Sequence, residues 1–434
     1  MGRMGERSAR KRAVVAALLL SASMAWTAVA QSAIQKAKGA SGNDSANGQA
    51  PAARIPVAPL GFVAPSPAYL SSRLSFATLN FIDKDHLLFT FHVNALLRRI
   101  PGDPPDDSDQ LIHAVVLEIK TGKVLQQADW RMHDRGRYLW ALRNGTFLVR
   151  VRNSLLLTDK SLVLRPYLTF DTDLQGVEVS PGRGLLMLEI KKYLPAKKGA
   201  TEGDGDSTPP PSLIAPEGVR RFRTQMALVR PGERELLGQA EFLNPAGVPL
   251  LENGVLDMDE GKKPGDWVIK REMLDKTTAV IGTVKSSCAP QLVSLSADVV
   301  LAQTCPVRGG GNAVSALSIH GEVLWQEQWE SKYVWPQFES SEDGSRFAYE
   351  SLETSRPMAG FDTPDGENVA SQPVGVFDTK TGKLALVKDA SPILSAGQNF
   401  ALTADGCRFA ILRNGAIEVY DLLPVVVETG KAKR

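Results

Sequence analysis

The five histidines are the first residues to test for metal or acid–base chemistry: His86, His92, His113, His133 and His320. Their spacing matches no metal-binding motif. His86 and His92 are six residues apart on one predicted strand, so they face the same side but stand about 20 Å apart. Two ligands of one zinc ion each lie about 2 Å from it, so this pair cannot share an ion. Histidines from distant parts of the chain could still converge on one axis.

Two acidic runs could bind calcium. The first extends from Asp103 to Asp109, and the second, Glu202 to Asp206, has carboxylates at positions 1, 3 and 5 of a possible calcium loop. An EF-hand has a bidentate Glu at position 12, where this chain has Leu213. We interpret both runs as solvated loops.

No recognised catalytic motif occurs in the chain. The run Gly309–Gly311 has no following Lys and no helix to hold a phosphate. The Gly-x-Ser-x-Gly and His-Glu-x-x-His motifs are absent from the sequence. We therefore predict no catalytic, metal-binding or cofactor-binding residue.

The three cysteines allow one disulfide and one remaining thiol. Cys288 and Cys305 bracket a hairpin-like sequence with a turn near Ala297. Such a turn places the two cysteines opposite each other, at the short Cα separation that a disulfide needs. We predict this bridge; the alternative is two reduced, buried cysteines. Cys407 lies in a predicted strand, where we expect it to be a small buried apolar side chain.

The first thirty residues are typical of a secretory signal peptide. A basic start is followed by an apolar run and then by small residues at the cleavage position, which we place between Ala30 and Gln31. The apolar run is shorter than the ~20 residues that span a bilayer. Cleavage removes five basic residues and one acidic residue, which changes the net charge of +2 to about −2. A nearly neutral protein gives no electrostatic argument for nucleic acid.

Residues 31–56 contain few bulky apolar side chains, so we expect a disordered tether. From about residue 57 the sequence changes to short alternating or apolar runs separated by turn residues. Examples are His86–Val93 and Thr146–Arg152. This pattern is typical of β-strands, and no long segment shows helical periodicity.

Two sequence elements recur along the chain. One is a turn that leads into a strand, as in Ser341–Ala348 and, almost identically, Thr403–Ala410. The other is a pair of strands joined by a tight turn with glycine, as in Val116–Lys123 and Val376–Lys383. Glycine supplies the positive φ that such a turn requires. Together the two elements describe one four-stranded antiparallel unit with strands A, B, C and D.

The turns between strands A and B mark seven units, at Asp85, Gly145, Gly182, Gly254, Asp298, Gly344 and Gly406. Their spacing is about 40 residues once three polar insertions are set aside, which is the period of a propeller blade. The insertions, residues 94–110, 192–221 and 353–372, all fall between strands B and C. Because strands alternate in direction, these loops emerge on one face.

We therefore predict an all-β fold, a seven-bladed β-propeller of four-stranded antiparallel blades spanning residues 57–428. Residues 429–434 would be a disordered tail. We expect Val57–Phe62 to close the ring by completing the blade that contains Gly415–Leu422, since an open edge would favour aggregation. Four tryptophans near blade edges should fill the space between sheets: Trp130, Trp325, Trp329 and Trp335.

The repeated elements resemble the blade signatures of the broad WD40-like and YVTN-type propeller superfamily. The resemblance covers residues from about 75 to 425 and is carried by Asp343–Ala348 and Asp378–Lys383. The Gly-His and Trp-Asp pairs of true WD40 blades are missing. The resemblance implies a fold but no particular function, because these propellers serve as scaffolds, binders and enzymes.

Two functions fit this fold. The first is a periplasmic or secreted, monomeric, non-catalytic scaffold that binds a protein or a cell-envelope ligand through its loop-rich face. The second is an enzyme with its site in the central channel, where each blade donates one residue. Three or more convergent His, Asp, Glu or Arg side chains in the channel would favour the enzyme.

Overall fold

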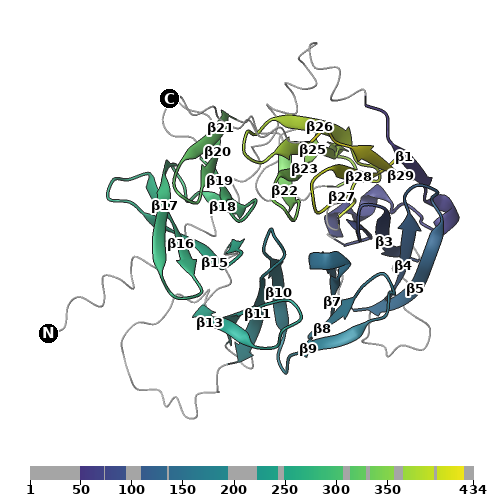
Figure 1. Ribbon diagram of the computed structural model, residues 1–434, viewed down its shortest axis with the longest axis horizontal. Coiled ribbons are helices and arrows are strands. Elements are labelled where there is room, and N and C mark those ends of the chain that lie inside the picture. Colours follow the sequence, from purple (N-terminus) through teal and green to yellow (C-terminus); the bar gives the residue numbers. More distant parts are fainter. Residues whose placement is uncertain are drawn as a thin grey trace, which may run out of the picture.

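The computed structural model describes residues 49–72, 74–93, 109–133, 136–193, 222–242, 249–305, 313–328, 333–355, 365–394 and 398–424. These residues form seven sheets arranged radially around a central axis (Figure 1). The predicted seven-bladed β-propeller is confirmed. The signal peptide, its cleavage position at Ala30 and Gln31, and the C-terminal tail lie outside the described residues.

Each blade is an antiparallel sheet; in blades 1 to 6 the four main strands lie in chain order across the sheet, and in blade 7 the N-terminal strand takes the last position. Blades 1 to 3 consist of β2 (Ala77–Phe81), β3 (His86–His92), β4 (Gln110–Glu118) and β5 (Val124–Met132); β6 (Leu139–Ala141), β7 (Phe147–Val151), β8 (Ser154–Thr158) and β9 (Arg165–Thr169); and β10 (Leu174–Val179), β11 (Leu186–Tyr193), β12 (Phe222–Val229) and β13 (Leu236–Phe242).

Blades 4 to 6 consist of β14 (Leu250–Leu251), β15 (Gly254–Glu260), β16 (Asp266–Met273) and β17 (Thr278–Lys285); β18 (Gln291–Ser294), β19 (Val299–Thr304), β20 (Ala313–Ser318) and β21 (Val323–Gln328); and β22 (Tyr333–Ser340), β23 (Arg346–Thr354), β25 (Pro373–Asp378) and β26 (Leu384–Asp389). The short β24 (Val369–Ser371) pairs with β23. Blade 7 consists of β27 (Phe400–Leu402), β28 (Arg408–Arg413), β29 (Ala416–Asp421) and β1 (Ala53–Pro56).

Six of the seven residues predicted to mark A–B turns lie between the first two strands of a blade; Gly254 is the first residue of β15, directly after the turn of blade 4. The three long insertions join strands B and C, as expected: β3 to β4, β11 to β12 and β23 to β25. Their central portions, 94–108, 194–221 and 356–364, lie outside the described residues. The insertions are shorter than predicted because Gln110, residues 192–193 and residues 353–354 belong to strands, and the third contains β24.

The ring is closed by β1, which pairs with β29 from Ala53 opposite Val419 to Pro56 opposite Ala416. Closure was expected at Val57–Phe62, after a tether that ended at residue 56. The strand begins earlier because its backbone pairs with the free edge of β29, and its inward side chain, Ile55, is buried at 3% exposure. Composition alone does not reveal so short a strand.

Apolar side chains fill the spaces between neighbouring blades, because a lone blade exposes both of its faces. Leu88 and Trp130 of blade 1 form one cluster with Phe147 and Val149 of blade 2. The inner strands are consequently buried on both sides, as in β19, where all six residues are buried. A buried side chain of this size contributes about 1.5–3 kcal/mol.

In blades 1 and 5, a tryptophan of the outer strand also fastens the blade to the turn between strands C and D of the next one. Trp130 in β5 donates its indole N–H to the carbonyl of Leu162 in blade 2, at 3.1 Å. Trp325 in β21 donates to the carbonyl of Thr379 in blade 6, at 2.9 Å. The prediction that these tryptophans fill the space between sheets is confirmed; the side chains of Trp329 and Trp335 are not among those described.

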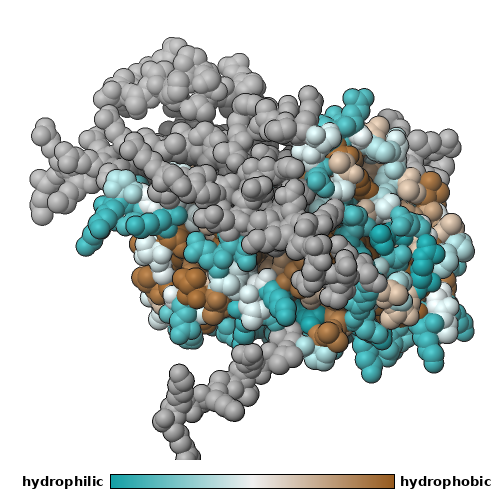
Figure 2. All heavy atoms as spheres, turned by 90° about the horizontal axis from the view of Figure 1, so that it is seen from above, coloured by the Kyte–Doolittle hydropathy of each residue, from teal (hydrophilic) through white to brown (hydrophobic). Residues whose placement is uncertain are grey.

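The pairing of strands C and D is interrupted by a register shift in blades 1 to 6. Such bulges twist an outer strand and make it a poor template for another chain. On the visible rim of the ring, apolar residues are interspersed among hydrophilic ones (Figure 2). No helix among the described residues is long and apolar enough to cross a membrane.

Candidate functional site

The innermost strands of the blades line a channel along the propeller axis. Two cavities of about 410 and 330 Å³ occupy it. The larger is lined by residues of blades 2 to 6, and the smaller by residues of blades 1, 2, 6 and 7. Both include Arg137 of blade 2 together with Phe338 and Glu339 of blade 6. Because several blades contribute to these cavities, the channel is the natural candidate for a binding site.

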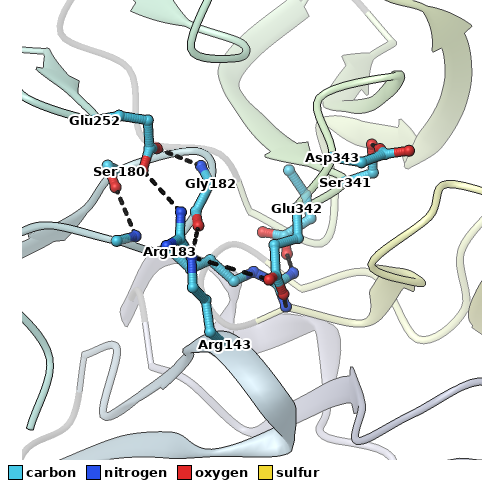
Figure 3. A network of polar contacts seen from close by, with 10 residues as sticks. Arg143, Ser180, Gly182, Arg183, Glu252, Ser341, Glu342 and Asp343 are labelled. Atoms are coloured by element: carbon cyan, nitrogen blue, oxygen red, sulfur yellow. Dashed lines mark hydrogen bonds and ion pairs between the residues drawn. The ribbon is translucent and has the colours of Figure 1, made fainter.

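An ion pair crosses the channel at the end where the turns between strands A and B lie. Arg183, in the turn of blade 3, places Nη2 3.3 Å from Oε1 of Glu339 and Nη1 3.9 Å from Oε2 of Glu342, both in blade 6 (Figure 3). Blades 3 and 6 stand on opposite sides of the ring. The pair therefore obstructs the channel at this end.

The local backbone explains how Arg183 reaches the axis. Its φ of +59° is left-handed, an uncommon conformation for a residue with a side chain. Ser180 stabilises the turn: its hydroxyl oxygen accepts hydrogen bonds from the N–H groups of Gly184, at 3.1 Å, and Leu185, at 3.0 Å. The Arg183 N–H donates to the Ser180 carbonyl at 2.8 Å.

A second set of contacts joins blades 2, 3 and 4 beside this ion pair (Figure 3). Arg143 donates from Nε to the carbonyl of Gly182 at 2.6 Å, and its Nη2 lies 3.3 Å from Glu252. The Gly182 N–H donates to the same Glu252 carboxylate at 2.5 Å. A Cβ at residue 182 would lie 2.9 Å from that carboxylate, so a larger residue here would require the Glu252 side chain to move.

Arg137 and Glu178 line the larger cavity from blades 2 and 3. Arg137 lies between β5 and β6, and its guanidinium carbon is 5.5 Å from the centroid of the Trp140 ring. Its Nε donates to the carbonyl of Leu139 at 3.3 Å. Glu178, in β10, lines the larger channel cavity and a neighbouring one of about 450 Å³, and Arg137 and Trp140 line both as well.

The position of Glu178 within the ring changes its acidity. Burial raises the pKa of its carboxyl, and the positive charge of Arg137 opposes part of that rise. Burial also raises the pKa of Glu189 in β11, and the charge of Glu178 raises it further. Blade 3 therefore carries two carboxyl groups that hold protons more readily than free glutamate does, and one of them, Glu178, lines the channel.

The channel thus contains four convergent charged side chains: Arg137, Glu178, Arg183 and Glu339. None of them was singled out from the sequence. The turn at Ser180–Gly182 was recognised as a repeat element, but strands of three to eight residues give no periodicity that identifies which side chains face the axis.

None of the histidines lines the described channel cavities. His92 is buried, which lowers its pKa to about 4, and its Nε2 lies 3.0 Å from the carbonyl of Ser75. His86 and His113 pair with Asp83 and Asp129. Across the described ranges, no three His, Cys, Asp or Glu side chains are grouped so as to hold a metal ion.

A buried carboxylate organises the face from which the B–C connections emerge. Asp109, the last residue of the first acidic run, lies with Oδ1 2.7 Å from His133 Nδ1 and 3.1 Å from Arg152 Nη2. Arg131 binds its other oxygen at 2.5 Å. These contacts join blades 1 and 2. The rest of that run, and the whole run from Glu202 to Asp206, lie outside the described residues.

Cys288 and Cys305 form a disulfide with a Cα–Cα distance of 5.6 Å. The bridge connects the segment before β18 with the end of β19, on the same face as the B–C connections. Cys407 is a free thiol and is exposed. The prediction that it is buried was wrong, because residue 407 belongs to the turn before β28 and its side chain points outwards from that turn.

No protein-family model matches the chain, and no curated protein matches its sequence. Solved structures that resemble it include the uncomplexed acylaminoacyl peptidase of Pyrococcus horikoshii, with 10% identity, 83% of this chain and 53% of that chain covered, and a TM-score of 0.47. The propeller domain of the trilobed protease from Pyrococcus furiosus has 8% identity and a TM-score of 0.43, and the match covers 82% of this chain and 100% of that domain.

A putative TolB from Agrobacterium tumefaciens has 11% identity and a TM-score of 0.35, and the match covers 69% of this chain and 94% of that chain. The chain spans about half the length of the peptidases it resembles. These likenesses concern the fold alone. The seven radial sheets make the protein a β-propeller.

Proposed function

We propose that this protein is an exported, non-catalytic binding propeller whose partner docks on the face where the B–C connections emerge. The observation that carries the proposal is the shared direction of the long connections. In blades 1, 3 and 6, strand B ends on this face at His92, Tyr193 and Thr354. Long loops on a rigid frame are where propellers and other β-folds concentrate binding.

The rigidity of this face supports the proposal. Asp109 fixes the start of β4 to both blade 1 and blade 2 through Arg131 and Arg152. The disulfide Cys288–Cys305 fixes the corresponding edge of blade 5. A preorganised surface of this kind loses little conformational entropy on binding. A partner protein or a cell-envelope ligand would be held there.

Export is part of the same proposal. Disulfides persist in oxidising compartments, and the first thirty residues have the order of a signal peptide. N-terminal sequencing of the protein from its native host should give a mature chain that begins at Gln31. A chain that retains residues 1–30 and has reduced cysteines would contradict export.

Loop replacement tests the docking face. Residues 197–215 and 356–364 should be replaced together by short Gly-Ser linkers, which leaves β11, β12, β23 and β24 complete. We expect an unchanged unfolding midpoint but loss of the partner that the wild-type protein recovers. The charge reversals Lys380→Glu and Lys383→Glu, on the opposite face, serve as the control and should leave partner recovery unchanged. Equal recovery by the loop variant would overturn the proposal.

A channel enzyme is the second candidate, because Arg137, Glu178, Arg183 and Glu339 converge as that alternative requires. Glu178 would hold the transferable proton, since burial raises its pKa. Turnover of pooled peptides, glycosides or esters by the wild-type protein but not by Glu178→Gln would favour this candidate over the binding protein.

A further inference from the structure

The residues Arg137, Trp140 and Glu178 stand where two cavities meet, one of about 410 Å³ and one of about 450 Å³. We call these three residues the channel junction. Arg137 comes from the connection before β6, Trp140 from β6 itself and Glu178 from β10, so blades 2 and 3 build the junction together. The docking face proposed above does not include it.

Arg137 is held in place yet keeps its charge available. Its Nε donates a hydrogen bond to the Leu139 carbonyl, and its guanidinium lies over the Trp140 ring. Within the described ranges, no carboxylate lies within 4.0 Å of its terminal nitrogens. A fixed guanidinium whose two terminal nitrogens have no protein carboxylate is suited to bind a carboxylate in a bidentate manner.

Glu178 supplies the negative charge of the channel junction, opposite in sign to that of Arg137. No hydrogen bond or ion pair engages its carboxylate in the described part of the chain, although Arg137 acts on it electrostatically. The Glu178 side chain is exposed to solvent, but the neighbouring blades partly desolvate its carboxyl and so raise the pKa. A cation placed beside Glu178 would lower that pKa again, because an opposite charge favours the ionised carboxylate.

The walls of the channel add uncharged polar groups. Oε1 of Gln291 and Oγ of Ser294 are buried in the larger cavity with no hydrogen-bond partner among the described residues. In the smaller cavity Gln398, at 9% exposure, likewise has an unpartnered Nε2. Buried polar atoms of this kind require a partner, and amide or carboxylate groups of a ligand can supply it.

We propose that the channel junction binds a small zwitterion, an amino acid or a short peptide with free ends. Its carboxylate would pair with Arg137 and its ammonium with Glu178. The two charges of the junction have opposite sign and lack close protein partners, so a ligand that carries both charges satisfies both. Cavities of 410 and 450 Å³ fit small-molecule ligands, for which about 300–1,000 Å³ is usual.

The test is equilibrium dialysis of the full chain against four pools, with retained species identified by mass spectrometry. The pools are free amino acids, tripeptides with both ends free, the same tripeptides acetylated at the N-terminus, and the same tripeptides amidated at the C-terminus. We expect one of the two free-ended pools to be retained, which identifies the source of the zwitterion. Capping either end of that ligand should weaken binding about 10-fold to 100-fold, since each cap removes one charged hydrogen-bonding group.

Single substitutions test whether Arg137 and Glu178 each bind one charged group of the ligand. Arg137→Gln and Glu178→Gln should each lose retention to the same degree, whereas Arg234→Gln, an exposed arginine in the turn after β12, should retain the ligand as the wild-type protein does. Each unfolding midpoint verifies that the variant is folded. Retention of neither free-ended pool, or equal retention of capped and free tripeptides, would overturn the proposal even if every variant were unstable.

The loop-replacement protein distinguishes this proposal from the proposed function. Its channel residues are all retained, so it should bind the zwitterion while it loses its partner on the docking face. Loss of zwitterion binding in that protein would mean that the loops, and not the junction, hold the ligand.

Discussion

Arg183 and Glu339 lie 3.3 Å apart although they belong to blades on opposite sides of the ring. Neighbouring blades are held together by apolar packing, but these two residues connect blades that share no such interface. The ion pair therefore limits the width of the channel as well as obstructing one of its ends.

Removing this ion pair should destabilise the protein. Arg183→Met removes the cation beside Glu339 and Glu342, at 17% and 24% side-chain exposure, and Glu342 keeps Arg143 Nε at 4.0 Å. We expect a loss of about 1–3 kcal/mol in the free energy of unfolding, measured by urea denaturation at neutral pH. The control is Arg165→Met, which breaks an ion pair with Asp159 whose side chains are 52% and 35% exposed. That change should cost less than about 1 kcal/mol, and equal costs would contradict a special role for Arg183.

The disulfide should contribute strongly to stability. Cys288 and Cys305 are separated by 17 residues, and closing a loop of this length stabilises a protein by about 3 kcal/mol. The double variant Cys288→Ala and Cys305→Ala should therefore unfold at lower urea concentration, and a reducing agent should have the same effect on the wild-type protein. Cys407→Ser serves as the control, because its thiol is exposed and free. No change in the double variant would show that the bridge stabilises nothing.

Glu350 should make stability depend on pH. This fully buried carboxyl in β23 has its pKa raised from 4.5 to about 8, mainly because burial disfavours its charged form. Between these values the folded protein binds a proton that the unfolded chain has lost, so stability falls as the pH rises through this range. The slope is up to about 1.4 kcal/mol per pH unit.

Glu350→Gln tests this dependence, because the new amide oxygen can still accept the hydrogen bond that Gln372 donates at 2.9 Å. The variant should match the wild-type protein near pH 5 and exceed its stability near pH 8, as measured by urea unfolding across that range. Parallel stability curves for the two proteins would refute the assignment.

Substituting two glycines that have similar φ values distinguishes the cost of a steric clash from the cost of an unfavourable backbone conformation. Gly382 (φ +67°) and Gly415 (φ +71°) are both left-handed, but a Cβ at residue 382 would lie 2.7 Å from the Trp325 ring, whereas one at residue 415 meets nothing within 4 Å. We expect Gly415→Ala to cost about 1 kcal/mol for its backbone alone. Gly382→Ala should cost about 1–3 kcal/mol more, because Trp325 must move. Thermal unfolding of both variants gives the comparison, and equal losses would exclude the close packing of Trp325.

The blades could be predicted from sequence because their turns are local. Gly344 and Gly406 have positive φ and sit in nearly identical hexapeptides, so backbone chemistry alone marks them. The channel residues could not be predicted in this way. Arg183 and Glu339 are 156 residues apart in the chain, and no local sequence pattern around either residue indicates that they form an ion pair.

The errors have the same origin. Cys407 stands between the turn glycine Gly406 and the first residue of β28, Arg408, and sequence pattern alone assigned it to the strand. Ala53–Pro56 becomes a strand only because β29 offers an unpaired edge, a property of the folded ring and not of four residues.

The pairing of β1 with β29 has a consequence for assembly. The two strands lie more than three hundred residues apart, since Arg54 contacts the carbonyl of Asn414 across a separation of 360. Contacts so distant in the chain form late. Until they form, β29 carries a vacant edge that the Ala53–Pro56 segment of a second molecule would satisfy with the same hydrogen bonds. Concentrated refolding would thus favour strand-exchanged oligomers over single rings.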